Sequence, residues 1–138
     1  MKRLETTIRN TRAELTHIST AVDRFAANCG LSKDVVADLQ VALNEVLTNI
    51  IDYGYTDVAE HEIRICLEVS GDVLEAAIED DGVAFDPLRR AAPDLNAPLR
   101  ERRVGGLGIH FVKNLMNETH YDRVGDRNRL VLRKRLRV

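Results

Sequence analysis

The sequence has no tryptophan and few other residues of the types that mark special structural classes. Only three Phe, three Tyr, three Pro and two Cys occur in 138 residues. The core must therefore be built mainly from Leu, Val, Ile and Ala. No apolar run approaches the roughly 20 residues of a membrane-spanning helix. Cys29 and Cys66 are far apart and lack metal-binding or redox spacing. We expect two free, buried thiols, with a disulfide between them as the alternative.

Charge and the amino terminus exclude further classes of protein. The formal net charge of −2 gives no global attraction to nucleic acid or to an anionic membrane. Residues 1–10 lack the apolar centre of a secretory signal, so we expect a cytoplasmic protein. With 44% hydrophobic and 30% charged residues, the chain is expected to fold as one domain over residues 1–138.

A long amphipathic helix that ends near Tyr53 organises the chain. Its apolar stripe has the three- and four-residue spacing of a buried helix face: Val35, Val36, Leu39, Leu43, Val46, Leu47 and Ile50. A second stripe carries acid, amide and small side chains: Asp38, Ala42, Glu45, Asn49 and Asp52. Glu45 and Asn49 are one turn apart and should lie side by side. This stripe could form the floor of a small-molecule site, and a plain surface of a core helix is the alternative.

The remaining pattern predicts strands in adjacent pairs. Alternating residues predict strands at about 3–8, 61–70, 73–79, 120–124 and 128–136, the last with one wet, basic face. Helical spacing predicts an earlier helix from Thr11 to Asn28, capped by Asn10 or Thr11 and ended by Gly30, and Ser32 should cap the long helix. Paired strands favour an α+β two-layer sandwich, in which helices cover one face of a mixed, mainly antiparallel sheet.

A long loop and a glycine-rich turn follow the predicted hairpin. Residues 83–104 hold three prolines, five arginines and little periodicity, which is typical of a functional loop such as a lid. Residues 105–108 read Gly-Gly-Leu-Gly and open the last helix. Glycines at a helix start let backbone N–H groups approach an anion, although plain loop flexibility explains them equally well.

Three motifs in order resemble the N, G1 and G2 boxes of the GHKL ATPases, the superfamily with the Bergerat nucleotide-binding fold. They read ALNEVLTNIIDYGY, IEDDGVAFDP and GGLGIHFVKNLMNETHY. More narrowly, nearly the whole chain resembles the stand-alone anti-sigma-factor serine/threonine kinases of bacterial partner-switching systems. The resemblance implies the Bergerat fold, ATP or ADP as ligand, and Mg²⁺.

The resemblance also implies roles for individual residues. Glu45 would be the general base on a substrate hydroxyl, and Asn49 would hold Mg²⁺. Asp80 would accept a hydrogen bond from the adenine amino group, and Gly82 would let the base approach the backbone.

On the phosphate side, the resemblance implies a wall formed by Gly106, Leu107 and Gly108. Arg103 or Arg102, in the predicted lid, would meet the phosphates.

Three residues depart from the family pattern. Ala84 stands where a second glycine is usual in the G1 box, so we expect a stiffer hinge for the lid. Tyr53 stands where related kinases often carry histidine. Asn128 is the nearest match to a threonine that many relatives have beside the adenine site.

The implied function is an ATP-dependent protein serine/threonine kinase that acts as an anti-sigma or partner-switch regulator. It would phosphorylate a STAS-domain antagonist and hold a sigma factor or another regulator, commonly as a homodimer. We expect no direct contact with nucleic acid or membrane. Three alternatives stay open: a non-catalytic ATP-binding module, the catalytic part of a histidine kinase, and an α+β protein that binds no nucleotide.

Overall fold

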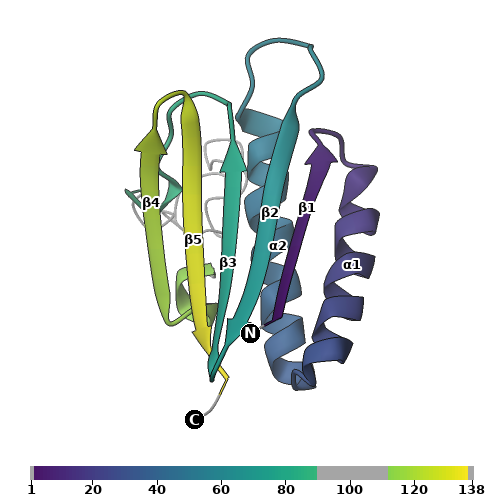
Figure 1. Ribbon diagram of the computed structural model, residues 1–138. Helices are drawn as coiled ribbons and strands as arrows, with labels where there is room; N and C mark the ends of the chain where they lie inside the picture. Colours follow the sequence, from purple (N-terminus) through teal and green to yellow (C-terminus); the bar gives the residue numbers. More distant parts are fainter. Residues whose placement is uncertain (1, 90–111, 137–138) are drawn as a thin grey trace, which may run out of the picture.

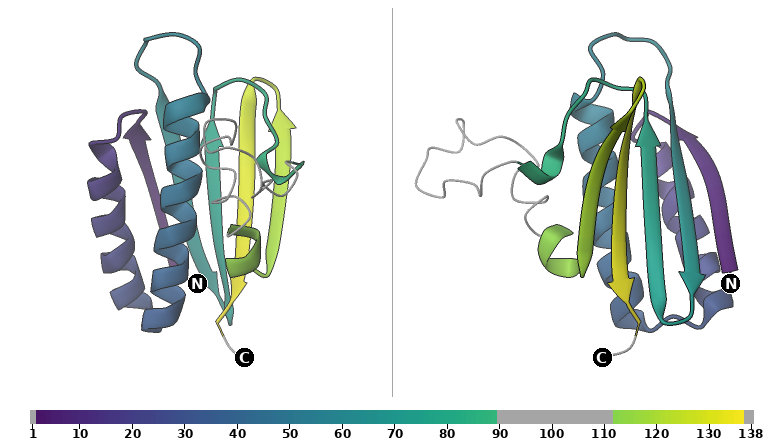
Figure 2. Two further views of the ribbon diagram at one scale, coloured as in Figure 1. Left: turned by 180° about the vertical axis from the view of Figure 1, so that it is seen from behind. Right: turned by 60° about the vertical axis from the view of Figure 1, so that its left-hand side comes forward.

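The computed structural model describes residues 2–89 and 112–136, and it has two layers (Figure 1). One layer is a five-stranded sheet in the order β1-β2-β3-β5-β4. The other layer is formed by α1 and α2, which cover the same face of the sheet (Figure 2). The predicted α+β sandwich is confirmed, and every strand pairing among the described residues is antiparallel.

The strands follow the predicted alternation closely. Their bounds are Lys2–Arg9 for β1, Glu62–Ser70 for β2, Val73–Asp80 for β3, Glu118–Val124 for β4 and Arg127–Arg135 for β5. Gly71 and Gly125 make the tight turns of the two hairpins with positive φ angles of 61° and 62°. Glycine adopts this left-handed conformation without the steric cost that a side chain would bring.

The two helices are α1 (Glu14–Cys29) and α2 (Lys33–Tyr53). Ser32 caps α2 as predicted, because its hydroxyl accepts a hydrogen bond from Val35 N at 3.2 Å. Gly30 ends α1 in the left-handed conformation, also as predicted.

The predicted start of α1 was wrong. The helix begins three residues later than Thr11, and its N-cap residue, Ala13, has no capping side chain. The amide oxygen of Asn10 instead accepts a hydrogen bond from His61 N at 2.9 Å. The Asn10 side chain therefore binds the segment before β2 and does not cap α1.

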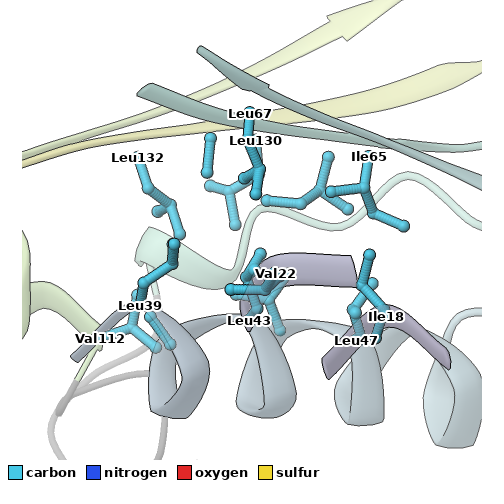
Figure 3. Close-up of a cluster of buried hydrophobic side chains, with 14 of the residues drawn as sticks. Ile18, Val22, Leu39, Leu43, Leu47, Ile65, Leu67, Val112, Leu130 and Leu132 are labelled. Atoms are coloured by element: carbon cyan, nitrogen blue, oxygen red, sulfur yellow. The ribbon is translucent and has the colours of Figure 1, made fainter. Parts of the chain in front are cut away.

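The core lies between the helices and the covered face of the sheet (Figure 3). Aliphatic side chains from both layers are buried there, including Ile18, Val22, Leu39, Leu43, Leu47, Ile65, Leu67, Leu130 and Leu132. Burying each such side chain contributes about 1.5–3 kcal/mol. Among the described residues, the core is mainly Leu, Val, Ile and Ala, as the composition predicted.

The opposite face of the sheet carries charged side chains that pair across strands. Glu79 on β3 lies 3.3 Å from Arg129 on β5, and Glu75 lies 2.8 Å from Arg133. The basic face of β5 is thus partly balanced by acidic neighbours. Cys66 lies on this uncovered face and is half-buried, so the expected buried thiol is in fact a free, partly accessible one.

Candidate functional site

A pocket of about 460 Å³ lies between the second half of α2, the ends of β3, β4 and β5, and residues 83–87. Most of its lining is apolar, and its polar groups come from a few side chains. It is lined by Val46, Asn49, Ile50, Tyr53, Gly54, Ile78, Asp80, Val83, Phe85, Pro87, Tyr121, Asn128 and Leu130. A largely apolar pocket with a few fixed polar groups is typical of a small-molecule site.

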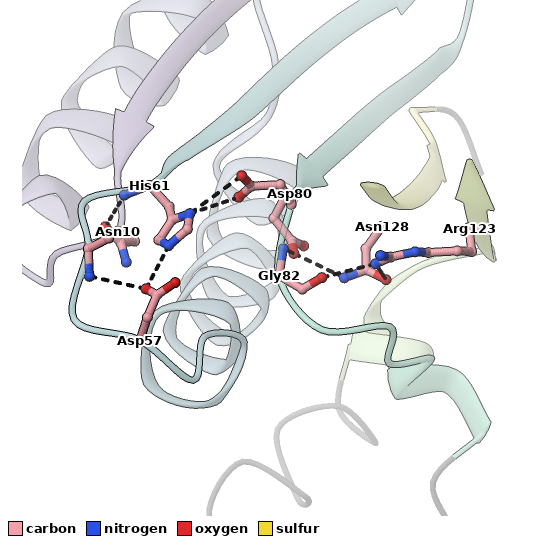
Figure 4. Close-up of polar contacts among 9 residues, drawn as sticks. Asn10, Asp57, His61, Asp80, Gly82, Arg123 and Asn128 are labelled. Atoms are coloured by element: carbon pink, nitrogen blue, oxygen red, sulfur yellow. Dashed lines mark hydrogen bonds and ion pairs between the residues drawn. The ribbon is translucent and has the colours of Figure 1, made fainter. Parts of the chain in front are cut away.

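Asp80 is the charged group of this pocket. It ends β3 and is only 5% exposed. Its Oδ1 atom accepts hydrogen bonds from Gly82 N at 2.8 Å and from Asn128 Nδ2 at 3.0 Å (Figure 4). Among the described residues, Oδ2 accepts none, so this oxygen is available to a donor in the pocket.

Gly82 lies where two backbone segments meet. A Cβ atom built on it would lie 2.3 Å from the carbonyl oxygen of Gly54 and 2.9 Å from Asp80 Oδ1. The next amide, Val83 N, donates to the same Gly54 oxygen at 2.8 Å. Only glycine fits here, because any side chain would push the loop after β3 away from the end of α2.

The variant Gly82→Ala is therefore expected to lose about 1–3 kcal/mol of unfolding free energy, because backbone atoms must shift to admit the methyl group. It should also weaken ADP binding, because Asp80 Oδ1 must move. Chemical denaturation and calorimetric titration with ADP measure both effects. Gly71→Ala is the control, because Gly71 makes the β2–β3 turn at the opposite end of β3 from Asp80, and strain there should leave ADP affinity unchanged.

Asn49 and Glu45 lie one turn apart on α2 but border different spaces. Asn49 lines the pocket, and its Nδ2 atom is buried without a hydrogen-bond partner among the described residues. Glu45 lines a separate groove of about 370 Å³ between α1 and α2. Burial raises the pKa of the Glu45 carboxyl, and the nearby Asn49 amide opposes this shift.

The other members of the predicted polar stripe do not join a common site. Ala42 is fully buried in the core. Asp52 pairs with Arg12 of the turn before α1, at 2.5 Å, and Asp38 pairs with Lys134 of β5, at 2.9 Å. Of this stripe, Asn49 alone lines the pocket.

Several predicted site residues lie outside the described residues. They are Arg102, Arg103, Gly106, Leu107 and Gly108, together with most of the predicted lid. Of the lid, residues 83–89 are described, and they end in the short 3-10 helix η1 (Pro87–Arg89).

The three departures from the family pattern all lie in or beside the pocket. Tyr53 lines it and is 52% exposed, and Ala84 lies between two lining residues. Asn128 is paired directly with Asp80 in the β3–β5 register. Asn128 therefore lies beside Asp80 at one end of the pocket.

Sequence reasoning missed two groups of residues around Asp80. Tyr121 and Arg123 on β4 both donate to Asn128 Oδ1. The two residues are spaced two apart, which places them on one side of a strand. This spacing does not show that their side chains meet Asn128 on the neighbouring strand.

The second missed group surrounds His61, just before β2. Its Nε2 atom lies 2.8 Å from Asp57 Oδ1, and its Nδ1 atom lies 3.3 Å from Asp81 Oδ1 (Figure 4). The ring of Tyr55 stacks on the imidazole with centroids 4.3 Å apart. The hydrogen bond that the imidazole donates to Asp57, assisted by Asp81, raises the pKa of His61. This cluster ties residues 54–61 to the strand end that carries Asp80.

The variant His61→Gln is expected to destabilise the protein more at pH 6 than at pH 9. Because the folded-state pKa of His61 is raised, its stabilising contribution is complete below the ordinary pKa of 6.5 and is lost as pH rises through the folded-state value. Urea unfolding of the wild type and the variant at both pH values measures the difference. The role would be contradicted if the variant lost the same unfolding free energy at both pH values. It would also be contradicted if His120→Gln, at an exposed position, showed an equally large pH-dependent loss.

Residues 8–134 match the model of the family described as "Histidine kinase-like ATPase domain". The chain belongs to this family. The match covers the pocket and both strands that carry Asp80 and Asn128. It confirms the resemblance to the GHKL ATPases that the three motifs indicated.

Two curated relatives illustrate the similarity. Serine-protein kinase RsbW from Listeria monocytogenes serovar 1/2a is 28% identical over 104 residues, which cover 71% of this chain and 66% of that protein. Serine-protein kinase RsbW from Bacillus cereus is 34% identical over 98 residues, which cover 67% of this chain and 60% of that protein. The chain thus spans less than two thirds of the length of these relatives.

A solved structure confirms the family's fold for this chain. It is the crystal structure of the RsbU and RsbW domains of Rv1364c from Mycobacterium tuberculosis, with a TM-score of 0.71 at 20% sequence identity. The superposition covers 99% of this chain and 33% of that one.

In residues 2–89 and 112–136, no helix is long and apolar enough to cross a membrane.

Proposed function

We propose that the pocket binds ATP and ADP through their adenine base. The observation that carries this proposal is the state of Asp80: one carboxylate oxygen is held by two donors, and the other is left for the pocket. An adenine amino group is a donor that fits this oxygen. The apolar lining would take the flat base.

Asn49 is the residue that we propose as the Mg²⁺ ligand. Its side chain borders the pocket, and the amide oxygen is the atom that would hold the ion. Bound Mg²⁺ would neutralise phosphate charge, and it needs few protein ligands because phosphates and waters supply the others. No cluster of three or more His, Cys, Asp or Glu residues suited to a metal occurs within the described residues.

Glu45 is the proposed general base for transfer to a protein serine or threonine. The carboxylate would accept the hydroxyl proton as that oxygen attacks the terminal phosphorus of ATP, and ADP would leave. Its place on α2, one turn from Asn49, would put it beside the phosphates rather than under the base. The similarity to two proteins named serine-protein kinase RsbW supports this activity.

The proposed substrate is a STAS-domain protein, and the proposed second partner is a sigma factor or another regulator. These partners follow from the resemblance to partner-switching kinases. The homodimer stays a prediction.

Incubation with ATP and Mg²⁺ tests the proposal, using each STAS-domain protein of the source organism in turn. Intact mass spectrometry should show the gain of one phosphoryl group on one partner. The gain should disappear with Glu45→Ala. Absence of transfer to every partner, together with retained ATP binding, would contradict the kinase activity.

A non-catalytic nucleotide-binding switch is the second candidate function. One observation favours it: Glu45 does not line the pocket but faces the groove between the helices. In that case Glu45→Ala would leave partner binding and its nucleotide dependence unchanged.

A further inference from the structure

The loop of residues 54–61 joins α2 to β2 and borders the pocket at its first residue. Gly54 lines the pocket, and its carbonyl oxygen accepts a hydrogen bond from Val83 N at 2.8 Å. At the other end of the loop, His61 N donates to Asn10 Oδ1 at 2.9 Å, and Asn10 N donates to His61 O at 3.0 Å. The loop is therefore held by the pocket wall at one end and by the segment after β1 at the other.

The His61 side chain contacts the chain neighbours of two pocket-lining residues (Figure 4). Its ring stacks on the ring of Tyr55, which follows Gly54. Its Nδ1 atom lies 3.3 Å from Oδ1 of Asp81, which follows Asp80. The imidazole therefore links the loop to the end of β3 directly beside the pocket.

The charge of the imidazole decides how many of these contacts it can make. Its Nε2 atom lies 2.8 Å from Asp57 Oδ1, and its Nδ1 atom faces Asp81. The imidazolium donates from both nitrogens, whereas the neutral ring has a single N–H. Because the contact with Asp57 is the shorter one, we expect the remaining proton to stay on Nε2. The lone pair of Nδ1 then faces the carboxylate of Asp81, and the two acceptors repel each other.

We propose that His61 is a proton switch for nucleotide binding: the imidazolium holds Asp81 and the loop in the arrangement that binds the nucleotide, and loss of its proton releases them. This inference rests on the proposed binding of ATP and ADP. Release of Asp81 disturbs the adjoining Asp80, and release of the loop disturbs the contact between Gly54 and Val83. The positive charge beside the pocket also attracts an anionic ligand. Both effects lower nucleotide affinity as pH rises.

Three ionisable groups face the imidazole among the described residues: Asp57, Asp81 and the stacked Tyr55. The segment after β1 contributes the neutral amide of Asn10. The hydrogen bond from His61 lowers the pKa of Asp57, so this carboxylate stays ionised at neutral pH. Burial, together with the negative charges at the end of β3, raises the pKa of Tyr55, so its hydroxyl stays neutral. His61 is thus the member of this cluster whose charge changes near neutral pH.

The expected effect is moderate, because water screens both ion pairs. The side chains of Asp57 and Asp81 are 57% and 38% exposed. We expect the ADP affinity of the wild type, divided by that of His61→Gln, to fall about threefold to tenfold from pH 6 to pH 9. Calorimetric titration of both proteins with ADP measures this ratio. ADP itself loses a proton in this range, and the comparison with the uncharged glutamine cancels that contribution.

Thermodynamic linkage gives a test that needs no variant. If the imidazolium favours ADP, bound ADP must raise the pKa of His61 by the same free energy. NMR titration of the imidazole protons, with and without saturating ADP, measures this rise. His120, which is exposed on β4, is the internal control, and its ring signals should titrate identically in both samples.

The variant Asp81→Asn separates the switch from a merely structural role of the loop. Its amide can donate to the neutral Nδ1 atom or accept from the protonated one, so both forms of the ring keep their contact. We expect this variant to bind ADP and to lose the pH dependence that depends on His61. Asp122→Asn, at an exposed position of β4, is the control and should keep that dependence.

Two results would overturn the inference. One is a loss of ADP affinity in His61→Gln that is equal at every pH, since this shows only a structural role. The other is a pKa of His61 that does not respond to ADP in a protein that binds ADP, and it decides the matter even if the variants do not fold. A wild-type protein that binds no ADP at any pH refutes the proposed function itself, and this inference fails with it.

Discussion

Replacing Asp80 with asparagine is expected to weaken ADP binding at least about 100-fold, because the substitution turns the one free acceptor into a donor that faces the amino group of the base. The fold should survive. The Oδ1 atom of the new side chain can still accept from Gly82 N and Asn128 Nδ2, which are its two partners in the native structure.

Calorimetric titration measures the affinity, and thermal denaturation with and without ADP gives an independent reading. A ligand well above its Kd raises the free energy of unfolding, so the ADP-dependent rise in Tm should vanish in the variant. Asp122→Asn, at an exposed position of β4, is the control. An Asp80→Asn variant that binds ADP within about threefold of the wild type would rule out Asp80 as the base-binding residue.

Replacing Glu45 with glutamine is expected to lower phosphoryl transfer by about 10²–10⁴-fold, the range typical of a lost general base. ADP affinity should stay within about twofold of the wild type, because Glu45 lies outside the pocket lining. The measurement combines single-turnover transfer to the protein substrate with titration of ADP. Exposed Glu62→Gln is the matched control.

The pH profile of the same reaction gives a second test of Glu45. Its carboxyl must be ionised to accept a proton, and burial raises its pKa above the ordinary value of 4.5. Transfer should therefore rise with pH through a limb that lies above pH 4.5 and is absent in Glu45→Gln. A variant that transfers at the wild-type rate would place the base elsewhere.

Local structure could be predicted well from residue spacing and turn residues. The alternation in β2 and β3 and the apolar spacing of α2 gave these elements with ends correct to within one residue or so. Gly30 correctly marked the end of α1, and Ser32 correctly marked the start of α2. These features depend on interactions within a few residues along the chain, which the sequence displays directly.

Local reasoning failed where a distant residue competed for the same group. Asn10 or Thr11 was expected to cap α1, but the Asn10 side chain accepts a hydrogen bond from the backbone of His61, 51 residues away in the sequence. The charged cluster around His61 also escaped notice, because Asp57, His61 and Asp81 make no recognised motif. Their proximity arises when the loop after α2 packs against the end of β3.

The sequence by itself determined the order of strands and helices, the two-layer class and the three motifs that indicate a nucleotide-binding family. These properties depend on periodicity and on motif spacing. Only the tertiary structure decided which side chains share a site. It placed Asp80 opposite Asn128 through an antiparallel register across 48 residues, and it set Asn49 against the pocket and Glu45 against the neighbouring groove. The reason is that sheet register and helix packing depend on contacts between segments far apart in the chain, which no local pattern specifies.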